Sequence, residues 1–304
     1  LQYHLGWVDE DFLPVKVHGG KRIRPLLTML SCQASGGNWK KSVPAAAAVE
    51  ILHNFSLIHD DIEDVSPTRR GRKTVWKIWG EAQAINSGDA MYSLAQLTMI
   101  RLAERDIPPN TIIRALRRFN ETCLLLTKGQ YDDMSFESRH TVAVSEYIDM
   151  INGKTAVLLA LCAELGALIA AQDDHIVNHY GEFGRNLGLA FQVIDDILGI
   201  WGEESKTGKS AATDIITKKK TLPVLYGLEQ SDFLKDLYRQ APADEVFVSE
   251  VVNKLDELGA REYASQLAFD YSAAAHQHLQ DAKPTGEAGA ALIQLADMLL
   301  QRDY

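Results

Sequence analysis

Apolar residues recur along the chain at helical spacing, and strand-like alternation is nearly absent. The stretch 44–64 is rich in Ala and Leu, with Pro44 as a start signal and Pro67 as a stop signal. The stretches 147–171 and 175–201 are long and apolar, and their scattered glycines permit close contacts between helices. This pattern predicts an all-α protein built as one domain.

One long region interrupts the helical pattern. Residues 202–223 are rich in Gly, Ser, Thr and Lys, and irregular loops of this length are often active-site lids. We therefore expect a lid loop at 202–223 and a separate N-terminal segment at 1–18, within a single domain that spans 1–304.

Composition narrows the classes of partner. The chain has 304 residues, of which 46% are hydrophobic and 24% charged, as in soluble globular proteins. Its net charge of −10 argues against broad binding of nucleic acid or anionic membranes. The most apolar run, 156–171, has only 16 residues and contains Glu164. It is too short to cross a bilayer and is typical of a buried helix, so we expect no transmembrane segment.

The cysteines indicate a reducing environment. Cys32, Cys123 and Cys162 are odd in number, far apart, and form no CxxC pair. They predict neither a disulfide framework nor a zinc site, and they favour a cytoplasmic location.

Four carboxylates gather at the end of the 44–64 stretch: Asp60, Asp61, Glu63 and Asp64. On a helix, Asp60 and Asp64 share one face, where like charges repel, and the helix dipole disfavours acids at this end. A solvated helix end is the simpler interpretation, but the residues just upstream are apolar. Metal binding is favoured, because carboxylates suit Mg²⁺, whose coordination substrate phosphates can complete.

A second acidic pair, Asp195 and Asp196, interrupts the apolar stretch 175–201. Buried carboxylates need partners. Two acid-bearing helices facing each other across a cavity would hold Mg²⁺ ions, and the ions would hold a diphosphate. Two other pairs carry less weight. Capping explains Asp173-Asp174, whereas Asp132-Asp133 is either an exposed face or a support.

Basic residues follow the first acidic cluster. Arg69 and Arg70 are close enough in sequence to fold back beside it, and Arg matches phosphate oxygens with two parallel hydrogen bonds. Further bases are Lys21, Arg22, Arg24, Lys154, Lys209 and Lys218 to Lys220. Each alone is more often a surface charge. Together with the two acidic helices, they predict two diphosphate sites, one on metal ions and one on bases.

In this combination and order, the motifs resemble those of the trans-isoprenyl diphosphate synthase (polyprenyl synthetase) family, from about residue 19 to the end. The matching stretches are "GGKRIRP", "LIHDDIED" with "RRG", "GQYDD", "GKT", "FQVIDD" and "TGKSAATDI…KKTLP". The resemblance implies a single-domain isoprenoid synthase bundle of helices around a deep central cavity, usually as a homodimer.

The resemblance also implies a reaction. Isopentenyl diphosphate would be joined head to tail to an allylic diphosphate held by three Mg²⁺ ions, with Asp60, Asp64 and Asp195 as metal ligands. The departing diphosphate would be stabilised electrostatically by the ions and basic side chains. The implied catalytic residues beyond the ligands are Asp61, Arg69, Lys154, Thr155, Gln192, Lys209 and Lys219, with the Thr and Gln oxygens facing the allylic cation. The implied substrate-binding residues are Lys21, Arg24, His53, Arg70 and Phe191, although Phe191 could be purely a core residue.

Product length is implied by the two residues upstream of Asp60. In the family, farnesyl synthases tend to be aromatic both five and four residues before this position, and synthases of the twenty-carbon product only five before. Here Phe55 and Ser56 stand at these positions. We expect geranylgeranyl diphosphate, with farnesyl diphosphate as the second choice.

Two departures from the family pattern leave alternatives open. Gly199 stands where the second motif usually ends in Asp, and Lys73 stands where Pro often follows "RRG". The stretch 195–203 also resembles the metal motif of class I terpene cyclases, but that motif needs a hydroxyl at position 199. A non-catalytic subunit of a prenyl synthase heteromer is a third possibility, against which the intact "DDIED" argues.

Overall fold

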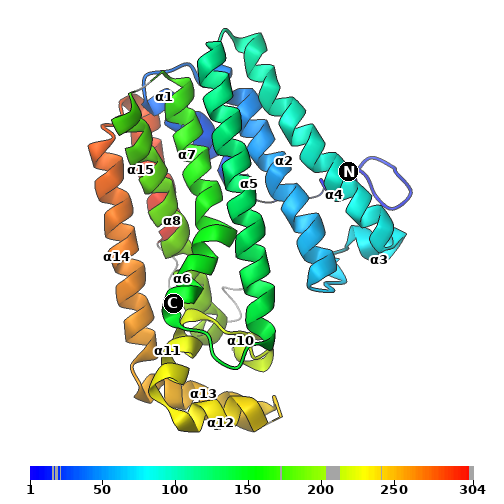
Figure 1. Ribbon diagram of the computed structural model, residues 1–304, viewed down its shortest axis with the longest axis vertical. Coiled ribbons are helices and arrows are strands. Elements are labelled where there is room, and N and C mark those ends of the chain that lie inside the picture. Colours follow the sequence, from blue (N-terminus) through cyan, green and yellow to red (C-terminus); the bar gives the residue numbers. More distant parts are fainter. Residues whose placement is uncertain are drawn as a thin grey trace. The chain divides into compact units, whose positions relative to one another are not determined.

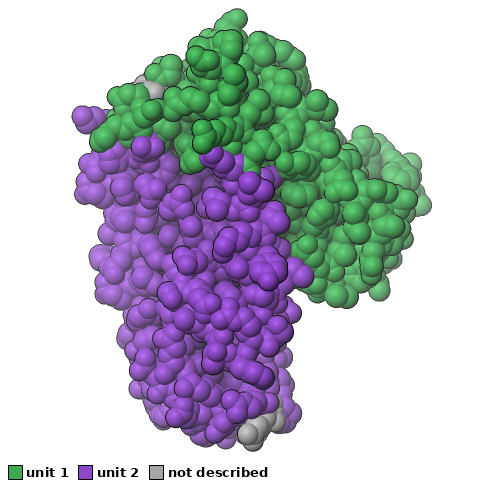
Figure 2. Space-filling view, in the orientation of Figure 1, with its two compact units in different colours: residues 1–120, 162–177, 284–289 green, residues 121–161, 178–283, 290–304 purple. Residues whose placement is uncertain are grey.

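A computed structural model describes residues 1–15, 17, 20, 22–171, 173–202, 213–240 and 242–300. The described chain is almost entirely helical (Figure 1), which confirms the all-α prediction. It divides into two compact units (Figure 2). Unit 1 comprises 1–120, 162–177 and 284–289, and unit 2 comprises 121–161, 178–283 and 290–304. The single domain over 1–304 stays a prediction.

Unit 1 is organised around two antiparallel helices, α2 and α4. Its elements are α1 (Ile23–Ala34), α2 (Trp39–Glu63), β1 (Thr68–Arg69), β2 (Arg72–Lys73), α3 (Val75–Trp79), α4 (Glu81–Ile100), η1 (Arg101–Arg105), the first part of α5 (Pro109–Ser138), the second part of α7 (Val157–Ile169), and the first turns of α8 (Asp174–Trp201) and α15 (Gly286–Leu300). The two short strands form a hairpin that follows α2 directly. A core cluster that includes Ile58, Val75, Ala84 and Met91 joins α2, α3 and α4. This packing fixes the end of α2, where the first acidic cluster lies.

Helix α2 starts five residues before the predicted stretch 44–64. Asn38 caps it, because its side-chain oxygen accepts a hydrogen bond from the Lys40 N–H at 3.0 Å. Pro44 therefore lies inside the helix instead of starting it, which corrects the prediction. The end at Glu63 agrees with the predicted stop.

Unit 2 contains the remaining helices. They are the rest of α5, α6 (Val144–Ile151), a π-helical turn (Asn152–Ala156), the first part of α7 (Val157–Ile169), α8 (Asp174–Trp201) from residue 178, α10 (Thr213–Ile216), α11 (Leu222–Gln230), α12 (Asp232–Gln240), α13 (Glu245–Glu257), α14 (Ala260–Asp281) and most of α15 (Gly286–Leu300). One buried cluster joins α6, α8, α11 and α14. A second joins the end of α8 to α10 through α13.

The predicted helix 147–171 is interrupted by the π-helical turn 152–156. Its cause is a close approach to α5, because a Cβ atom on Gly129 would lie 2.3 Å from the Lys154 backbone nitrogen. Only glycine permits this contact. Single π-helical turns often occur at functional sites, and this one carries Lys154 and Thr155.

The predicted loop 202–223 is partly helical. Helix α10 lies within it and α11 begins at Leu222, while 203–212 lie outside the described residues. Its assignment as a lid stays a prediction.

One helical stretch, Val144–Ile169, is long and apolar enough to cross a membrane by composition alone. Most of its apolar part is buried inside the protein, as in the core helix of a globular protein.

Candidate active site

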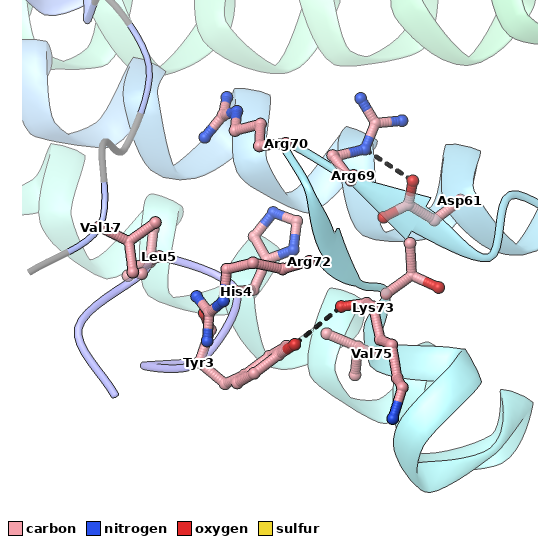
Figure 3. Close-up of a pocket in the computed structure, with 12 residues that line it drawn as sticks. Tyr3, His4, Leu5, Val17, Asp61, Arg69, Arg70, Arg72, Lys73 and Val75 are labelled. Carbon is pink, nitrogen blue, oxygen red and sulfur yellow. Dashed lines mark hydrogen bonds and ion pairs between the residues drawn. The ribbon is translucent and has the colours of Figure 1, made fainter. Parts of the chain in front are cut away.

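The first acidic cluster is held together by one arginine. Arg69, on β1, donates from Nε to Asp61 Oδ1 at 2.6 Å and from Nη2 to Asp60 Oδ2 at 2.8 Å (Figure 3 draws the first bond). Asp61 is only 2% exposed, and its Oδ2 has no hydrogen-bond partner among the described residues. Burial raises the pKa of Asp61, and the hydrogen bond and charge of Arg69 oppose that shift. The guanidinium thus offsets the repulsion between the two acids.

Asp60 and Asp64 keep the predicted helical spacing. The Asp64 N–H donates to the Asp60 carbonyl oxygen at 2.9 Å, which closes the last turn of α2. Asp64 is exposed and Asp60 half-buried. Both carboxylates therefore lie at the accessible end of one helix, while Asp61 is turned inward.

A cluster of cations lies beside this helix in the same unit. Burial is the main cause that lowers the pKa of His53 well below its ordinary value, and the charges of Arg24, Arg70 and Arg69 act in the same direction. Burial also lowers the pKa of Arg24, with the Arg70 charge adding to the effect and Glu50 opposing it. The Arg24 Nε is buried and lacks a hydrogen-bond partner among the described residues. Such a cluster fits a multiply charged anion. Lys21 lies outside the described residues.

The N-terminal segment packs against this basic region. Tyr3 donates its hydroxyl to the Lys73 carbonyl at 2.9 Å, and the Arg72 guanidinium lies 4.0 Å from the Tyr3 ring centre (Figure 3). His4 follows, and burial together with the charges of Arg69 and Arg70 lowers its pKa to about 3. The cavity here is small, about 30 Å³, which is room for water molecules. No periodic pattern of residues singles out His4 in the sequence.

The hairpin also accounts for Lys73, one of the two departures from the family pattern. Its carbonyl oxygen binds Tyr3, and its ammonium lies 3.7 Å from a Glu10 carboxylate oxygen in an exposed ion pair. The added charge therefore pairs with the N-terminal segment, although an exposed pair of this kind contributes little to stability.

Phe55 and Ser56 lie one turn before the acids and differ in what they contact. The Phe55 ring centre lies 5.0 Å from that of His59 and 5.4 Å from that of Tyr92, which is on α4. The Ser56 hydroxyl donates back to the His53 carbonyl at 2.9 Å. The aromatic ring thus fills space between α2 and α4, and position 56 adds no bulk.

In unit 2, Asp196 is a buried hydrogen-bond acceptor with several donors. Its Oδ2 accepts from the Tyr147 hydroxyl and from the Leu222 N–H, and its Oδ1 accepts from Gln192 Nε2 at 3.2 Å. It is 2% exposed, and burial raises its pKa to about 6. Its neighbour Asp195 is less buried. Asp196 thus ties α6, α8 and α11 together, and Asp195 is the more accessible acid of the pair.

The π-helical turn connects to this network. The Thr155 hydroxyl donates to Gln192 Oε1 at 3.1 Å, and the Lys154 ammonium donates to Asp133 on α5. Asp133 is therefore a support, one of the two interpretations that the sequence left open. Its neighbour Asp132 is in an ion pair with Lys128.

The structure also locates Asp173 and Lys219, two further charged residues that the sequence analysis named. Asp173 caps α8, since its Oδ1 accepts the Ile176 N–H at 3.0 Å, which confirms the capping interpretation. Burial alone would lower the pKa of Lys219, but the charges of Asp196, Asp214 and Asp133 outweigh it and raise that pKa. Lys219 thus lies among the acids of unit 2.

Phe191 is half-buried on α8. Its role, substrate contact or core packing, stays a prediction. Lys209 lies outside the described residues.

Gly199, where the second motif departs from the family pattern, is in contact with an acid from elsewhere in the chain. A Cβ atom at this position would lie 2.0 Å from Oδ2 of Asp214, which is on α10. A carboxylate group therefore occupies the space that a side chain at 199 would need. The sequence separates these residues by the loop 203–212, so no local pattern could have identified the contact.

The predicted metal ligands are divided between the units, Asp60 and Asp64 in unit 1 and Asp195 in unit 2. Within the described part of the chain, no three His, Cys, Asp or Glu side chains are grouped closely enough to hold an ion. All three predicted ligands are carboxylates, and one buried oxygen of Asp61 finds no hydrogen-bond partner in the part of the chain that the structure describes. This donor set fits Mg²⁺, which takes few protein ligands and completes its shell with water and phosphate.

The predicted site residues that the structure describes are divided between the two units. Unit 1 carries Arg24, His53, Asp60, Asp61, Asp64, Arg69 and Arg70, and unit 2 carries Lys154, Thr155, Phe191, Gln192, Asp195 and Lys219. Sequence reasoning did not single out His4, Tyr147 or Asp214.

Comparisons with known proteins agree with one another. The family model described as polyprenyl synthetase matches residues 9–255. The chain is 44% identical over 226 residues to a "(2E,6E)-farnesyl diphosphate synthase" of Mycobacterium tuberculosis, an alignment that covers 74% of this chain and 62% of that protein, less than two thirds of its length. It is 38% identical over 288 residues to a "Geranylgeranyl pyrophosphate synthase" of Geoglobus acetivorans, covering 94% of this chain and 88% of that protein. Among solved structures, a polyprenyl synthetase of Streptomyces coelicolor superposes with a TM-score of 0.90 at 34% identity, covering 98% of this chain and 90% of that one.

Proposed function

Because the chain belongs to the polyprenyl synthetase family, we propose that it is a Mg²⁺-dependent trans-prenyltransferase that joins isopentenyl diphosphate to an allylic diphosphate. One observation carries most weight. Unit 1 holds Arg24, His53 and Arg70 together, in the same unit as the carboxylates of α2. The buried Arg24 Nε has no hydrogen-bond partner among the residues that the structure describes. An anion site made of bases and a carboxylate set suited to Mg²⁺ are what a reaction between two diphosphates requires.

Asp60, Asp64 and Asp195 would hold Mg²⁺, with three ions per active site, and the ions would supply positive charge to the allylic diphosphate as its C–O bond breaks. Arg69 keeps Asp60 and Asp61 in place, and Asp133 orients the Lys154 ammonium. Lys154 and Lys219 add positive charge for the leaving diphosphate, a form of electrostatic stabilisation.

The remaining residues position the second substrate and the cation. Arg24 and Arg70 bind the diphosphate of isopentenyl diphosphate, and His53, kept neutral by burial and its cationic neighbours, adds a hydrogen bond. The Thr155 hydroxyl, held by Gln192, presents its oxygen to the allylic cation. On the resemblance alone, Lys21 is assigned to the binding of isopentenyl diphosphate and Lys209 to stabilisation of the leaving diphosphate.

Asp214 acts in place of the acid that the second motif lacks. Its carboxylate occupies the space beside Gly199, one helical turn beyond Asp195, and its charge acts on Lys219. We assign it the supporting role of the missing Asp, so that Gly199 is a compensated change and not a loss of function.

The product assigned to this chain is geranylgeranyl diphosphate. Small Ser56 beside bulky Phe55 supports this choice, while relatives of similar identity are named as synthases of either the farnesyl or the geranylgeranyl compound. Ser56→Phe should shorten the main product by at least one five-carbon unit, because a bulky side chain obstructs growth in a close-packed interior. Phe55→Ala should lengthen it.

The test is incubation of the protein with Mg²⁺, isopentenyl diphosphate and each allylic diphosphate in turn, followed by chromatography of the products. A longer linear diphosphate supports the proposal. A cyclic hydrocarbon would identify a terpene cyclase, and no product would favour a non-catalytic subunit. Unchanged chain length in both variants would place the limit on growth elsewhere.

A homodimer and a cytoplasmic location belong to the same proposal. Unit 1 exposes large aliphatic side chains on α4 and the start of α5, namely Ile85, Leu94, Leu97, Ile100 and Ile113. Apolar patches of this kind often mark protein interfaces. The three cysteines form no disulfide and are buried, as suits a reducing compartment.

A further inference from the structure

Unit 2 contains an open cavity of about 670 Å³, and of the bases predicted for the diphosphate sites only Lys218 and Lys220 are among its described lining residues. Its walls are the end of α5, the segment 139–143, the first turn of α6, and helices α11 and α12. Ligand pockets for drug-sized molecules commonly have volumes of about 300–1,000 Å³. The cavity is therefore large enough for an organic ligand.

Positive charge predominates around this cavity, although the chain as a whole carries −10. The lining includes Arg139, Lys218, Lys220, Lys235 and Arg239, against three glutamates.

Two of these glutamates are engaged at the start of α6. Glu146 accepts the Ala143 N–H and Glu229 accepts the Val144 N–H, both at 2.9 Å. The positive end of the helix dipole favours carboxylates at this place. The basic side chains therefore dominate the field in the cavity.

The bases differ in how firmly they are held. The Lys220 ammonium donates to the carbonyl oxygens of Phe136 and Arg139 at the end of α5, which fixes its position. Arg139 and Lys235 are 40% and 41% exposed and pair with Glu146 and Asp232 at 2.8 Å. Exposed ion pairs of this kind contribute little to stability. A phosphate group can therefore replace the carboxylate partners of Arg139 and Lys235 with little loss of stability.

The cavity also has an apolar surface. Val142 and Leu225 are 6% and 1% exposed, and Leu228 and Tyr238 are half-buried beside them. A purely ionic ligand would leave this surface uncovered. A ligand with a phosphate head and a hydrocarbon body would use both parts of the wall.

We propose that this cavity binds a phosphorylated isoprenoid as an effector that inhibits elongation. The choice of an isoprenoid body rests on the proposed function, because such molecules would be the enzyme's own products. The charged head is assigned to Arg139, Lys235 and Arg239, and the hydrocarbon body to Val142, Leu225 and Leu228.

The cavity is connected to the proposed active site through the segment after α10. Lys218 and Lys220 line the cavity on either side of Lys219 in sequence, and the Lys218 ammonium donates to the Tyr238 carbonyl at 2.9 Å. Burial and the charge of Asp214 raise the pKa of Tyr238, so this wall residue lies within the field of Asp214. A ligand that moves these side chains would displace Lys219 and Asp214.

The experiment measures binding of farnesyl monophosphate by isothermal titration calorimetry, with Mg²⁺ and geranyl thiodiphosphate present to fill the active site. We expect one equivalent to bind to the wild-type protein. Lys235→Glu with Arg239→Glu should weaken binding at least tenfold. A control with the same change in charge, Lys40→Glu with Arg105→Glu in unit 1, should not. The milder pair Lys235→Gln with Arg239→Gln should give an intermediate loss, should the charge reversal disturb folding.

Two further probes separate the possible ligands. Farnesol should bind at least tenfold more weakly than farnesyl monophosphate, because it lacks the charged head. If inorganic diphosphate binds as tightly as farnesyl monophosphate, the assignment of an isoprenoid body is wrong. No bound equivalent in the wild type, or equal binding by both charge-reversed proteins, would overturn the proposal.

Elongation assays distinguish failure of this inference from failure of the proposed function. The Lys235→Glu, Arg239→Glu protein should elongate at the wild-type rate without farnesyl monophosphate and resist inhibition by it. Equal inhibition of this protein and the wild type would contradict the effector role while leaving the synthase activity established. Absence of elongation in the wild type would instead contradict the proposed function.

Discussion

The two acidic motifs, at the end of α2 in unit 1 and near the end of α8 in unit 2, share one arrangement but are stabilised differently. In each, the second Asp is 2% exposed and the first is more accessible. Asp61 is bound by the Arg69 guanidinium, a charged partner eight residues away. Asp196 receives hydrogen bonds from neutral donors on Tyr147, Gln192 and the Leu222 backbone.

The two motifs therefore stabilise the negative charge of their buried carboxylate in different ways. Burial raises the pKa of both acids, and that of Asp196 reaches about 6. The Arg69 guanidinium opposes the shift at Asp61 through a direct hydrogen bond, whereas at Asp196 neutral donors and the charge of Lys219 oppose it. Asp61 belongs to a charge-balanced helix end that is assembled locally. Asp196 instead depends on α6 and α11 being folded against its own helix, α8.

The largest expected effect comes from removing the accessible acid of either motif. Asp60→Ala or Asp195→Ala should lower kcat about 10³-fold, as loss of a main electrostatic contact does, while circular dichroism shows an intact fold. Asp132→Ala is the control, since that acid forms an ion pair with the exposed Lys128 on the same helix. Substantial turnover of either site variant at saturating Mg²⁺ would contradict the assignment of metal ligands.

A second prediction separates the basic residues of the two units. Arg24→Ala should raise the KM for isopentenyl diphosphate at least tenfold and change that for the allylic substrate little, because Arg24 belongs to the basic cluster of unit 1. Lys154→Ala should act on kcat or on the allylic KM instead. Steady-state kinetics with each substrate varied in turn would reveal the difference. Equal effects of both variants on both substrates would refute two separate diphosphate sites.

The contrast between the motifs also explains what could be predicted from sequence. The helices followed from apolar periodicity, and Arg69 could be placed beside Asp60 and Asp61 because only a short hairpin separates them. The hairpin-bound N-terminal segment with His4 has no periodic pattern, so its place in unit 1 was not predictable. Tyr147 and Asp214 reach the second motif only through tertiary packing. The π-helical turn depends on contact with Gly129, which no local signal reveals.

A third prediction concerns stability and pH in unit 1. The pKa of His53 is lowered in the folded protein, so between its ordinary value near 6.5 and its native value the unfolded chain binds more protons. The free energy of unfolding should therefore fall as the pH drops below 6.5. His53→Gln should make that fall shallower by about 1 kcal/mol per pH unit, measured by urea denaturation between pH 6 and 5. Exposed His175→Gln is the control, and identical slopes for His53→Gln and the wild type would contradict this account.

The smallest expected effect tests the long-range support of the second motif most directly. The measurement is the Mg²⁺ concentration that gives half-maximal elongation, with calorimetry of Mg²⁺ binding in the presence of inorganic diphosphate as a second readout. Asp214→Ala should raise the required Mg²⁺ concentration about tenfold, as loss of a supporting group around a metal does. Gly199→Asp with Asp214→Ala should restore it, because the new carboxylate enters the vacated space. If Asp214→Ala behaves as the wild type, or if the double variant is as impaired as Asp214→Ala, Asp214 does not replace the missing acid.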